Sequence, residues 1–115
     1  MPHLIVEHSA ALADTHDLGA LSDALFDAAC AFPAFADHAH AVKTRMIASN
    51  HVRSGISPQT TAHLMVRMLP GRDPATKAAL SQTLLEVLKS HLADVGSLSV
   101  EIVDMDGTSY AKRAL

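Results

Sequence analysis

Aromatic side chains are scarce in this chain of 115 residues: they make up 3% of it, and Trp is absent. The core must therefore be filled by small aliphatic residues and Met, which supply most of a hydrophobic fraction of 49%. A chain this short can bury one core but has little room for two. We expect one domain over residues 1–115, made of a first half (1–55) and a second half (56–115).

Cysteine and runs of basic residues are also lacking. Cys30 is the only cysteine, so no disulfide can form within the chain, and we interpret it as a small core residue. The formal net charge is −3, and no cluster of Lys or Arg signals binding to nucleic acid or to an anionic membrane. No secretory segment and no apolar run of membrane-spanning length is recognisable. We therefore expect a cytoplasmic protein that binds neither nucleic acid nor membranes.

The first residues predict a strand that begins immediately after a proline. Over His3–His8 the apolar Leu4 and Val6 alternate with residues that face the other way. If Met1 is removed, Pro2 becomes an N-terminal secondary amine, which can act as a general base when burial or nearby cations bring its pKa near the working pH. The alternative interpretation is that Pro2 only opens an edge strand, where a missing N–H costs nothing.

Two amphipathic helices and three further strands follow this first strand. In both predicted helices the apolar residues recur at spacings of three and four. Asp73 is suited to cap the second helix, and Pro74 suits its first position. Residues 9–15 and 37–41 are expected to be irregular connections. The remaining predicted elements are a helix over about 17–31, a strand over 41–51, a strand over 63–69, a helix over 74–95 and a strand over 98–105.

The two halves of the chain repeat one another. His3-Leu4-Ile5-Val6 is echoed by His63-Leu64-Met65-Val66, and the predicted elements recur in the same order. We therefore expect an α+β, two-layer fold: a duplicated β-α-β unit whose four strands form one sheet, parallel within each unit, with both helices on one face. Outward positions such as Ile5 and Ile47 keep apolar side chains, so the other face needs cover, which oligomerisation would supply.

Three cations are candidates to act together with Pro2. Lys43 and Arg45 project to the same side of a predicted strand, and Arg72 lies in the turn before the second helix. A base with positive charge nearby suits proton abstraction from an anionic acid, because the developing enolate needs stabilisation. Arg suits bidentate carboxylate binding, whereas Lys supplies a compact point charge. Taken singly, each cation is also explained as a solvated surface residue.

The eight histidines raise the question of a metal site. His38 and His40 are two residues apart, so on an extended chain they share a face and could bind a divalent metal with a third ligand. No second spaced pair, cysteine partner or His-Glu-x-x-His pattern accompanies them, and we predict no metal. His8 is interpreted either as a packed structural residue or as a residue at the mouth of the site. Nucleophile-elbow and phosphate-loop motifs are missing.

Six segments in chain order carry a resemblance to a known family: Met1–Ser9, Phe32-Pro33, Val42–Arg45, His51–Arg53, Pro70–Arg72 and Leu98–Ile102. Together they resemble 5-carboxymethyl-2-hydroxymuconate Δ-isomerases, which belong to the tautomerase superfamily. The resemblance covers nearly the whole chain, and its most specific parts are the strand after Pro2 and the Gly71-Arg72 turn. Lys43 stands where this family usually has arginine, while Arg45 matches a second arginine. His8 and His63 occupy positions that are often aromatic.

The resemblance implies a homotrimer and a cofactor-free isomerase of aromatic-compound catabolism. Pro2 would act as the general acid and base that moves a proton between carbons of a 2-hydroxymuconate-like dienol. Arg72 would hold a carboxylate of this small anionic substrate or polarise its 2-oxo group, and Lys43, Arg45 and His8 would contribute to substrate binding.

A second function class is compatible with the same residues. A chain that keeps this fold without catalysis would serve as a trimeric ligand-binding or structural module. The two hypotheses differ most at Met1, because a retained Met1 makes the Pro2 nitrogen an amide with no basicity.

Overall fold

Four strands form one mixed sheet in the computed structural model, which describes residues 1–115. The strands are β1 (His3–Ser9), β2 (Lys43–Ser49), β3 (Thr61–Met68) and β4 (Ser97–Asp104), and their order in the sheet is β2-β1-β3-β4. β1 pairs in parallel with β2, β3 pairs in parallel with β4, and β1 pairs with β3 in the antiparallel sense. The predicted parallel pairing within each β-α-β unit is therefore confirmed.

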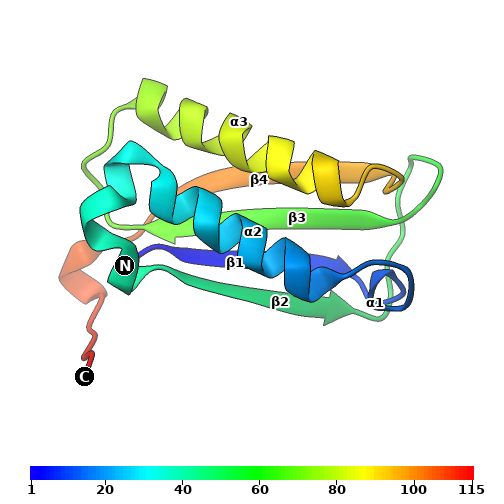
Figure 1. The fold of residues 1–115 in the computed structure, drawn as a ribbon, viewed down its shortest axis with the longest axis horizontal. Coiled ribbons are helices and arrows are strands. Elements are labelled where there is room, and N and C mark those ends of the chain that lie inside the picture. Colours follow the sequence, from blue (N-terminus) through cyan, green and yellow to red (C-terminus); the bar gives the residue numbers. More distant parts are fainter.

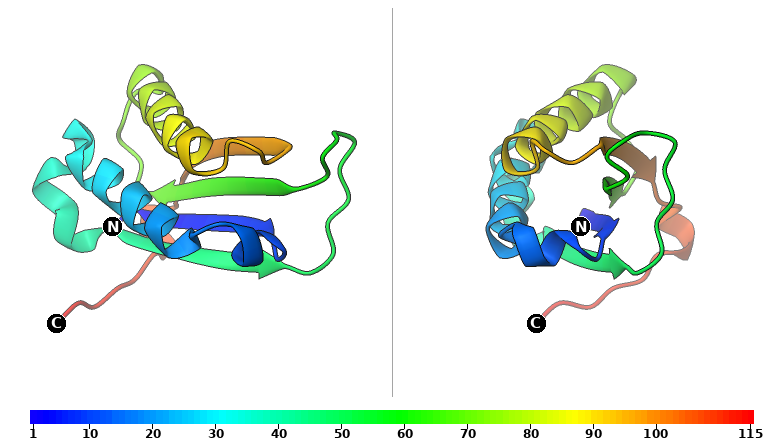
Figure 2. Two further views of the ribbon diagram at one scale, coloured as in Figure 1. Left: turned by 45° about the vertical axis from the view of Figure 1, so that its right-hand side comes forward. Right: turned by 90° about the vertical axis from the view of Figure 1, so that its right-hand side faces the viewer.

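Two long helices cover one face of this sheet. They are α2 (Leu18–Ala31) and α3 (Pro74–His91), which lie side by side in front of the strands (Figure 1). Viewed along the strands, the sheet curves around the inner sides of the two helices and leaves its other face uncovered (Figure 2). The predicted two-layer fold, with both helices on one face, is confirmed.

The helices begin where the sequence offers a cap. The Asp17 carboxylate accepts a hydrogen bond from the Ala20 N–H at 2.9 Å, and the Asp73 carboxylate accepts one from the Thr76 N–H at 2.7 Å. Each satisfies one of the backbone donors that a helix start leaves free. Pro74 occupies the start of α3, as predicted. α2 ends at Ala31 because the next residue, Phe32, precedes Pro33, and the residue before a proline is disfavoured in the helical conformation.

The core lies between the helices and the inner face of the sheet. The predicted alternation in β1 is confirmed, since Leu4 and Val6 are fully buried, and Leu64 and Val66 repeat this pattern on β3. The helices contribute one buried stripe each, composed of Leu21, Leu25 and Ala29 from α2 and Leu80, Leu84 and Leu88 from α3. Only Phe35 brings an aromatic ring into this cluster of 17 buried residues, so aliphatic packing does fill the core.

Two connections and the end of one helix differ from their predicted form. The segment after β1 contains a one-turn helix, α1 (Leu12–Thr15), and the segment after α2 forms a 3-10 helix, η1 (Pro33–Ala41). Such short helices contain too few residues for a periodic pattern to reveal them. The prediction that α3 runs to about Val95 was wrong: it ends at His91, because Leu92 has left the helical conformation. Leu92 is nevertheless buried, which is why the apolar pattern continues past the helix end.

The uncovered face of the sheet is partly apolar. Ile47 on β2 keeps 46% of its surface exposed, and Ile5 on β1 is partly exposed. Polar contacts cross the strands on the same face, where the His63 ring contacts Ser99 Oγ at 2.7 Å and a Glu101 carboxylate oxygen at 3.1 Å. This face therefore carries apolar side chains beside paired polar groups, with no second layer of the same chain over them.

No single helix of the protein is long and apolar enough to cross a membrane; α2 and η1 reach that length and composition only together, and they are bent by 119° at their junction.

Gly96 provides a test of the packing between the loop that precedes β4 and the loop that precedes β3. A Cβ atom at this position would overlap the carbonyl group of Pro58. Gly96→Ala should therefore lower the free energy of unfolding by about 1–3 kcal/mol, because neighbouring backbone must shift. Urea denaturation followed by circular dichroism measures this change. Gly55→Ala is the control: nothing lies within 4 Å of the point that its added methyl group would occupy, and its effect should stay within about 0.5 kcal/mol. Equal stabilities for the two variants would contradict this packing.

Candidate active site

One cavity lies at the end of the sheet where β1 begins. Its volume is about 250 Å³, and it is lined by Met1, Pro2, Phe35, His38, His40, Ala41, Met68, Leu69, Arg72 and Lys112. These residues come from the start of β1, from η1, from the end of β3 with the turn that follows, and from the C-terminal tail. No Asp or Glu is among them. The only permanently charged side chains that line the cavity are cations, so it favours an anionic ligand.

Pro2 is buried and its position is set by the neighbouring strand. Its carbonyl oxygen accepts a hydrogen bond from the Lys43 backbone N–H at 3.0 Å, immediately before the parallel pairing of β1 with β2 begins. The surroundings of Pro2 also affect the amine of Met1 at the chain terminus. Burial, followed by the charges of Lys43, Lys112 and Arg72, lowers the pKa of the Met1 amine from 8.0 to about 6. An amine at this end of β1 is therefore substantially unprotonated near neutral pH.

Arg72 reaches the cavity from the turn that joins β3 to α3. Gly71, directly before it, has a φ of 126°, a conformation that side-chain-bearing residues rarely adopt. The Arg72 Nη2 group donates a hydrogen bond to the Ala34 carbonyl oxygen at 3.0 Å, and the guanidinium carbon lies 5.5 Å from the centre of the Phe35 ring. Two contacts thus orient the guanidinium, and its remaining N–H donors are free to bind a carboxylate.

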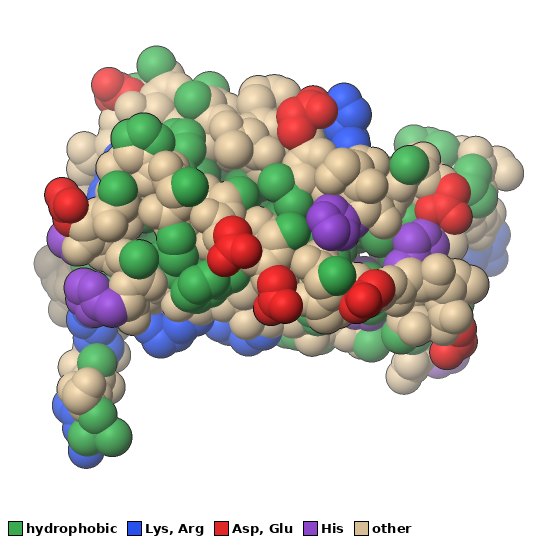
Figure 3. Space-filling model, in the orientation of Figure 1, with side chains coloured by type: hydrophobic (Ala, Val, Ile, Leu, Met, Phe, Trp, Pro, Cys, Tyr) green, Lys and Arg blue, Asp and Glu red, His purple; other side chains and the backbone are tan.

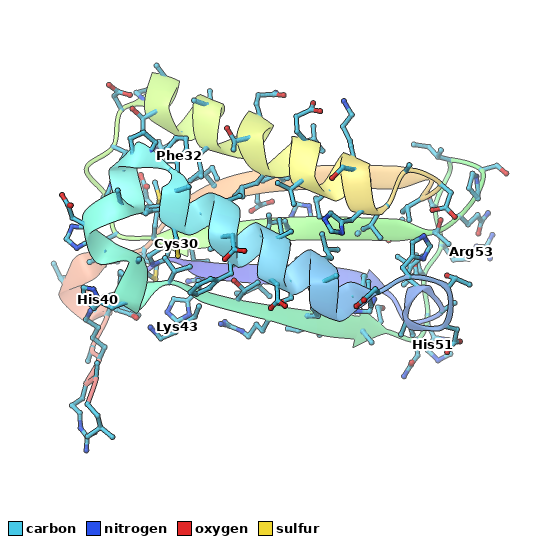
Figure 4. The ribbon with its side chains drawn as sticks, in the orientation of Figure 1. Cys30, Phe32, His40, Lys43, His51 and Arg53 are labelled. Atoms are coloured by element: carbon cyan, nitrogen blue, oxygen red, sulfur yellow. The ribbon has the colours of Figure 1, made fainter.

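Lys43 and Arg45 stand close to Pro2 but do not line the cavity. The Lys43 ammonium donates a hydrogen bond to the Ala41 carbonyl oxygen at 3.0 Å, and Arg45 Nη1 donates to Nδ1 of His3 at 3.2 Å. Figure 4 shows Lys43 at the same end of the sheet as His40. Lys and Arg side chains gather along the β2 edge of the molecule, below the acidic side chains of the helical face (Figure 3). In one chain the charge of Lys43 acts on the amine of Met1, which lines the cavity, whereas Arg45 acts on His3.

His8 lies far from this cavity. It is six residues after Pro2 on an extended strand, which corresponds to roughly 20 Å at about 3.3 Å per residue. Only 4% of its surface is exposed, and its Nδ1 donates to the Ser9 carbonyl oxygen at 2.9 Å. The expectation that His8 lies at the mouth of the Pro2 site is not met within one chain, because the strand carries it to the opposite end of the sheet.

Three polar side chains in the lining, those of His38, His40 and Lys112, were not predicted as parts of the site. The sequence suggests His38 and His40 only as metal ligands. Their ring centres are 6.4 Å apart. No group of three His, Cys, Asp or Glu side chains is arranged to hold a metal ion. Lys112 belongs to a tail that the sequence marks only as polar. Strand directions would have revealed it: β4 runs antiparallel to β1, so the residues after β4 emerge beside the start of β1.

Comparisons with known proteins identify the family of this chain and support its fold. The family model for 5-carboxymethyl-2-hydroxymuconate isomerase matches residues 2–114. Among solved structures, a 5-carboxymethyl-2-hydroxymuconate delta-isomerase is similar with a TM-score of 0.79 and 20% identity, covering 99% of this chain and 88% of that one. A 5-carboxymethyl-2-hydroxymuconate isomerase from Deinococcus radiodurans R1 has a TM-score of 0.81 and 23% identity, covering 97% and 88% of the two chains.

A fused 4-OT wild-type symmetric trimer is also similar, with a TM-score of 0.75 and 20% identity over 96% of this chain and 90% of that one. A search of curated proteins found no match. Identities this low establish the fold alone, whereas the family model spans nearly every residue. The chain therefore belongs to the 5-carboxymethyl-2-hydroxymuconate isomerase family.

Proposed function

We propose that this protein is an isomerase that moves a proton within a 2-hydroxymuconate-like dienol acid, with the amine of Pro2 as general acid and base. One observation carries the proposal: Pro2 is buried in the wall of a cavity whose permanently charged side chains, Arg72 and Lys112, are both cationic. Membership of an isomerase family supports the same reaction class. A substrate of this kind belongs to the breakdown of aromatic compounds.

The proposed reaction needs only one proton carrier. The neutral Pro2 amine takes the proton of the 2-hydroxyl group and becomes a secondary ammonium, while the electron pair of the broken O–H bond forms the C=O bond of the 2-oxo product. The ammonium then gives its proton to a carbon of the conjugated chain, and an electron pair of the shifted double bond forms the new C–H bond. The amine is regenerated neutral, so no external oxidant, reductant or cofactor enters the balance.

Arg72 supplies the positive charge that this proton transfer requires. Its planar guanidinium can bind a carboxylate with two parallel hydrogen bonds, or it can stabilise the oxygen that becomes negative as the proton leaves. Its contacts with Ala34 and Phe35 fix its orientation before substrate binds, which reduces the reorganisation needed during reaction. The charge of Lys43 lowers the pKa of the Met1 amine, and we expect it to disfavour protonation of the Pro2 amine in the same way once Met1 is removed.

We also propose that the protein works as a homotrimer. The uncovered face of the sheet, with Ile5 and Ile47 exposed to different degrees, offers an apolar surface for a second copy. The similar fused 4-OT protein is a symmetric trimer, which supports this arrangement. Arg45, whose side chain lies on that face beside His3, would then be buried near the subunit boundary.

Removal of Met1 decides between catalysis and a non-catalytic module. The form without Met1 should ketonise 2-hydroxymuconate, and Pro2→Ala should reduce kcat by about 10²–10⁴-fold, the usual contribution of a positioned general base. Ultraviolet absorbance follows the reaction, and intact mass establishes which terminus each sample carries. The control is the same protein purified with Met1 retained, which should be inactive. Equal rates for the wild type and Pro2→Ala would remove Pro2 from the mechanism, and a native protein that keeps Met1 would favour the non-catalytic module.

The pH dependence of activity tests the role of charge. The Pro2 amine is active when neutral, so kcat/KM should rise with pH through the pKa of this amine and level off above it. The charge of Lys43 lowers the pKa of the Met1 amine at this end of β1. We expect the same charge to act on the neighbouring Pro2 amine once Met1 is removed, so the acid limb of Lys43→Gln should move to higher pH. Arg53→Gln is the control, because Arg53 lies at the opposite end of the sheet (Figure 4). Superimposable profiles for Lys43→Gln and the wild type would refute this effect of Lys43.

A further inference from the structure

The C-terminal tail returns to the end of the sheet where the chain begins. After β4, the Met105 N–H donates to the Met68 carbonyl oxygen at 2.7 Å, and the short helix η2 (Gly107–Ser109) turns the chain. Figure 1 shows the tail, in red, emerging beside the N-terminus. Tyr110 then contacts His3, with its hydroxyl oxygen 3.0 Å from Nε2 and the two rings meeting edge to face at 6.1 Å.

The donors and acceptors of this contact can be assigned. Arg45 has only N–H donors, so Nδ1 of His3 accepts its hydrogen bond. The His3 ring is therefore neutral, with its proton on Nε2, and it donates to the Tyr110 hydroxyl oxygen. Burial, followed by the charges of Arg45, Lys43, the N-terminus and Arg67, lowers the pKa of His3 and favours this neutral form. Arg45, His3 and Tyr110 thus form a chain of two hydrogen bonds that attaches the tail to β1 and β2.

Two residues after Tyr110, Lys112 lines the cavity. It forms neither an ion pair nor a hydrogen bond, whereas Lys77 is paired with Asp104 and Lys89 with Glu86. Its charge nevertheless reaches the chain terminus, where it is among the causes that lower the pKa of the amine. Lys112 is exposed to solvent, so its ammonium is free to pair with an anion that enters the cavity.

We propose that Lys112 binds a second carboxylate of the substrate whose first carboxylate is bound by Arg72, and that Tyr110 positions Lys112 through its contact with His3. The proposal rests on the proposed function, since it concerns the same cavity. The two cations have different roles: the guanidinium of Arg72 is held in one orientation, whereas the ammonium of Lys112 is a point charge on a flexible stem. Lys112 therefore selects for a distal negative charge while tolerating variation in its position.

Binding of two unreactive acids tests Lys112 without any turnover. Adipate carries two carboxylates and hexanoate one on a chain of the same length. In calorimetric titrations of the protein without Met1, Lys112→Gln should weaken adipate binding by about tenfold, the size of one charge-assisted contact, and change hexanoate binding by less than about twofold. Arg113→Gln is the matched control: it removes the same charge from the next residue, which does not line the cavity. It should leave both affinities unchanged.

The outcomes separate this inference from the proposed function. Adipate binding that is the same in Lys112→Gln and wild type, or a loss that Arg113→Gln reproduces, would overturn the role of Lys112. If the isomerase assay fails while the adipate difference depends on Lys112, the cavity binds dicarboxylates and only the proposed reaction is wrong. Where turnover is observed, Lys112→Gln should raise KM for 2-hydroxymuconate by about tenfold and change kcat by less than about threefold, because uniform binding is lost.

Tyr110→Phe tests whether the tail contact acts through Lys112. This change keeps the ring and removes the hydroxyl group, so adipate binding should weaken by about threefold while hexanoate binding stays unchanged, as for the loss of one modest hydrogen bond. In the double variant with Lys112→Gln, Tyr110→Phe should cause no further loss, because its effect depends on the ammonium that it positions. A full additional loss in the double variant, or no loss in the single one, would overturn the positioning role.

Discussion

The antiparallel pairing of β1 with β3 is the contact on which the rest of this structure depends. It joins two units that are each parallel internally, through a register that runs from His3 opposite Arg67 to His8 opposite Ala62. Because of it, the starts of β1 and β2 and the ends of β3 and β4 all lie at one end of the sheet. Pro2, Arg72 and Lys112 are distant in sequence, and this topology alone brings them to one cavity. A site built in this way needs no long loop to assemble it.

The electrostatics at this end of the sheet follow from the absence of acidic side chains in the cavity lining. With no acidic side chain in the lining, the charges of Arg72 and Lys112 are not neutralised within the cavity. They therefore have two effects that support one another: they attract an anion, and they disfavour the protonated amine at the chain terminus. A bound dicarboxylate acts in the opposite sense, since its negative charge favours the protonated amine. Under the proposed function, a bound dicarboxylate would therefore strengthen the Pro2 amine as a base when it has to accept a proton.

Much of this fold could be predicted from the sequence because its signals are local. Alternation in β1 and the cap at Asp73 depend on neighbouring residues, and the structure has both of them. The end of α3 could not be predicted in the same way, because Leu92 is buried outside the helix and continues its apolar pattern. The distance of His8 from Pro2 follows from the length of the predicted strand alone. The location of Lys112 beside the cavity depends on strand direction, which no local pattern specifies.

Lys43 brings a point charge to this end of the sheet. Its ammonium donates a hydrogen bond to the carbonyl oxygen of Ala41, a residue that lines the cavity. A point charge held there cannot offer the planar pair of donors that an arginine would bring to a carboxylate. Arg72 is the only guanidinium that lines the cavity, so bidentate carboxylate binding falls to it. The other cation in the lining is Lys112, whose ammonium is a point charge without a fixed direction. In the proposed function it suits substrates whose second carboxylate varies in position.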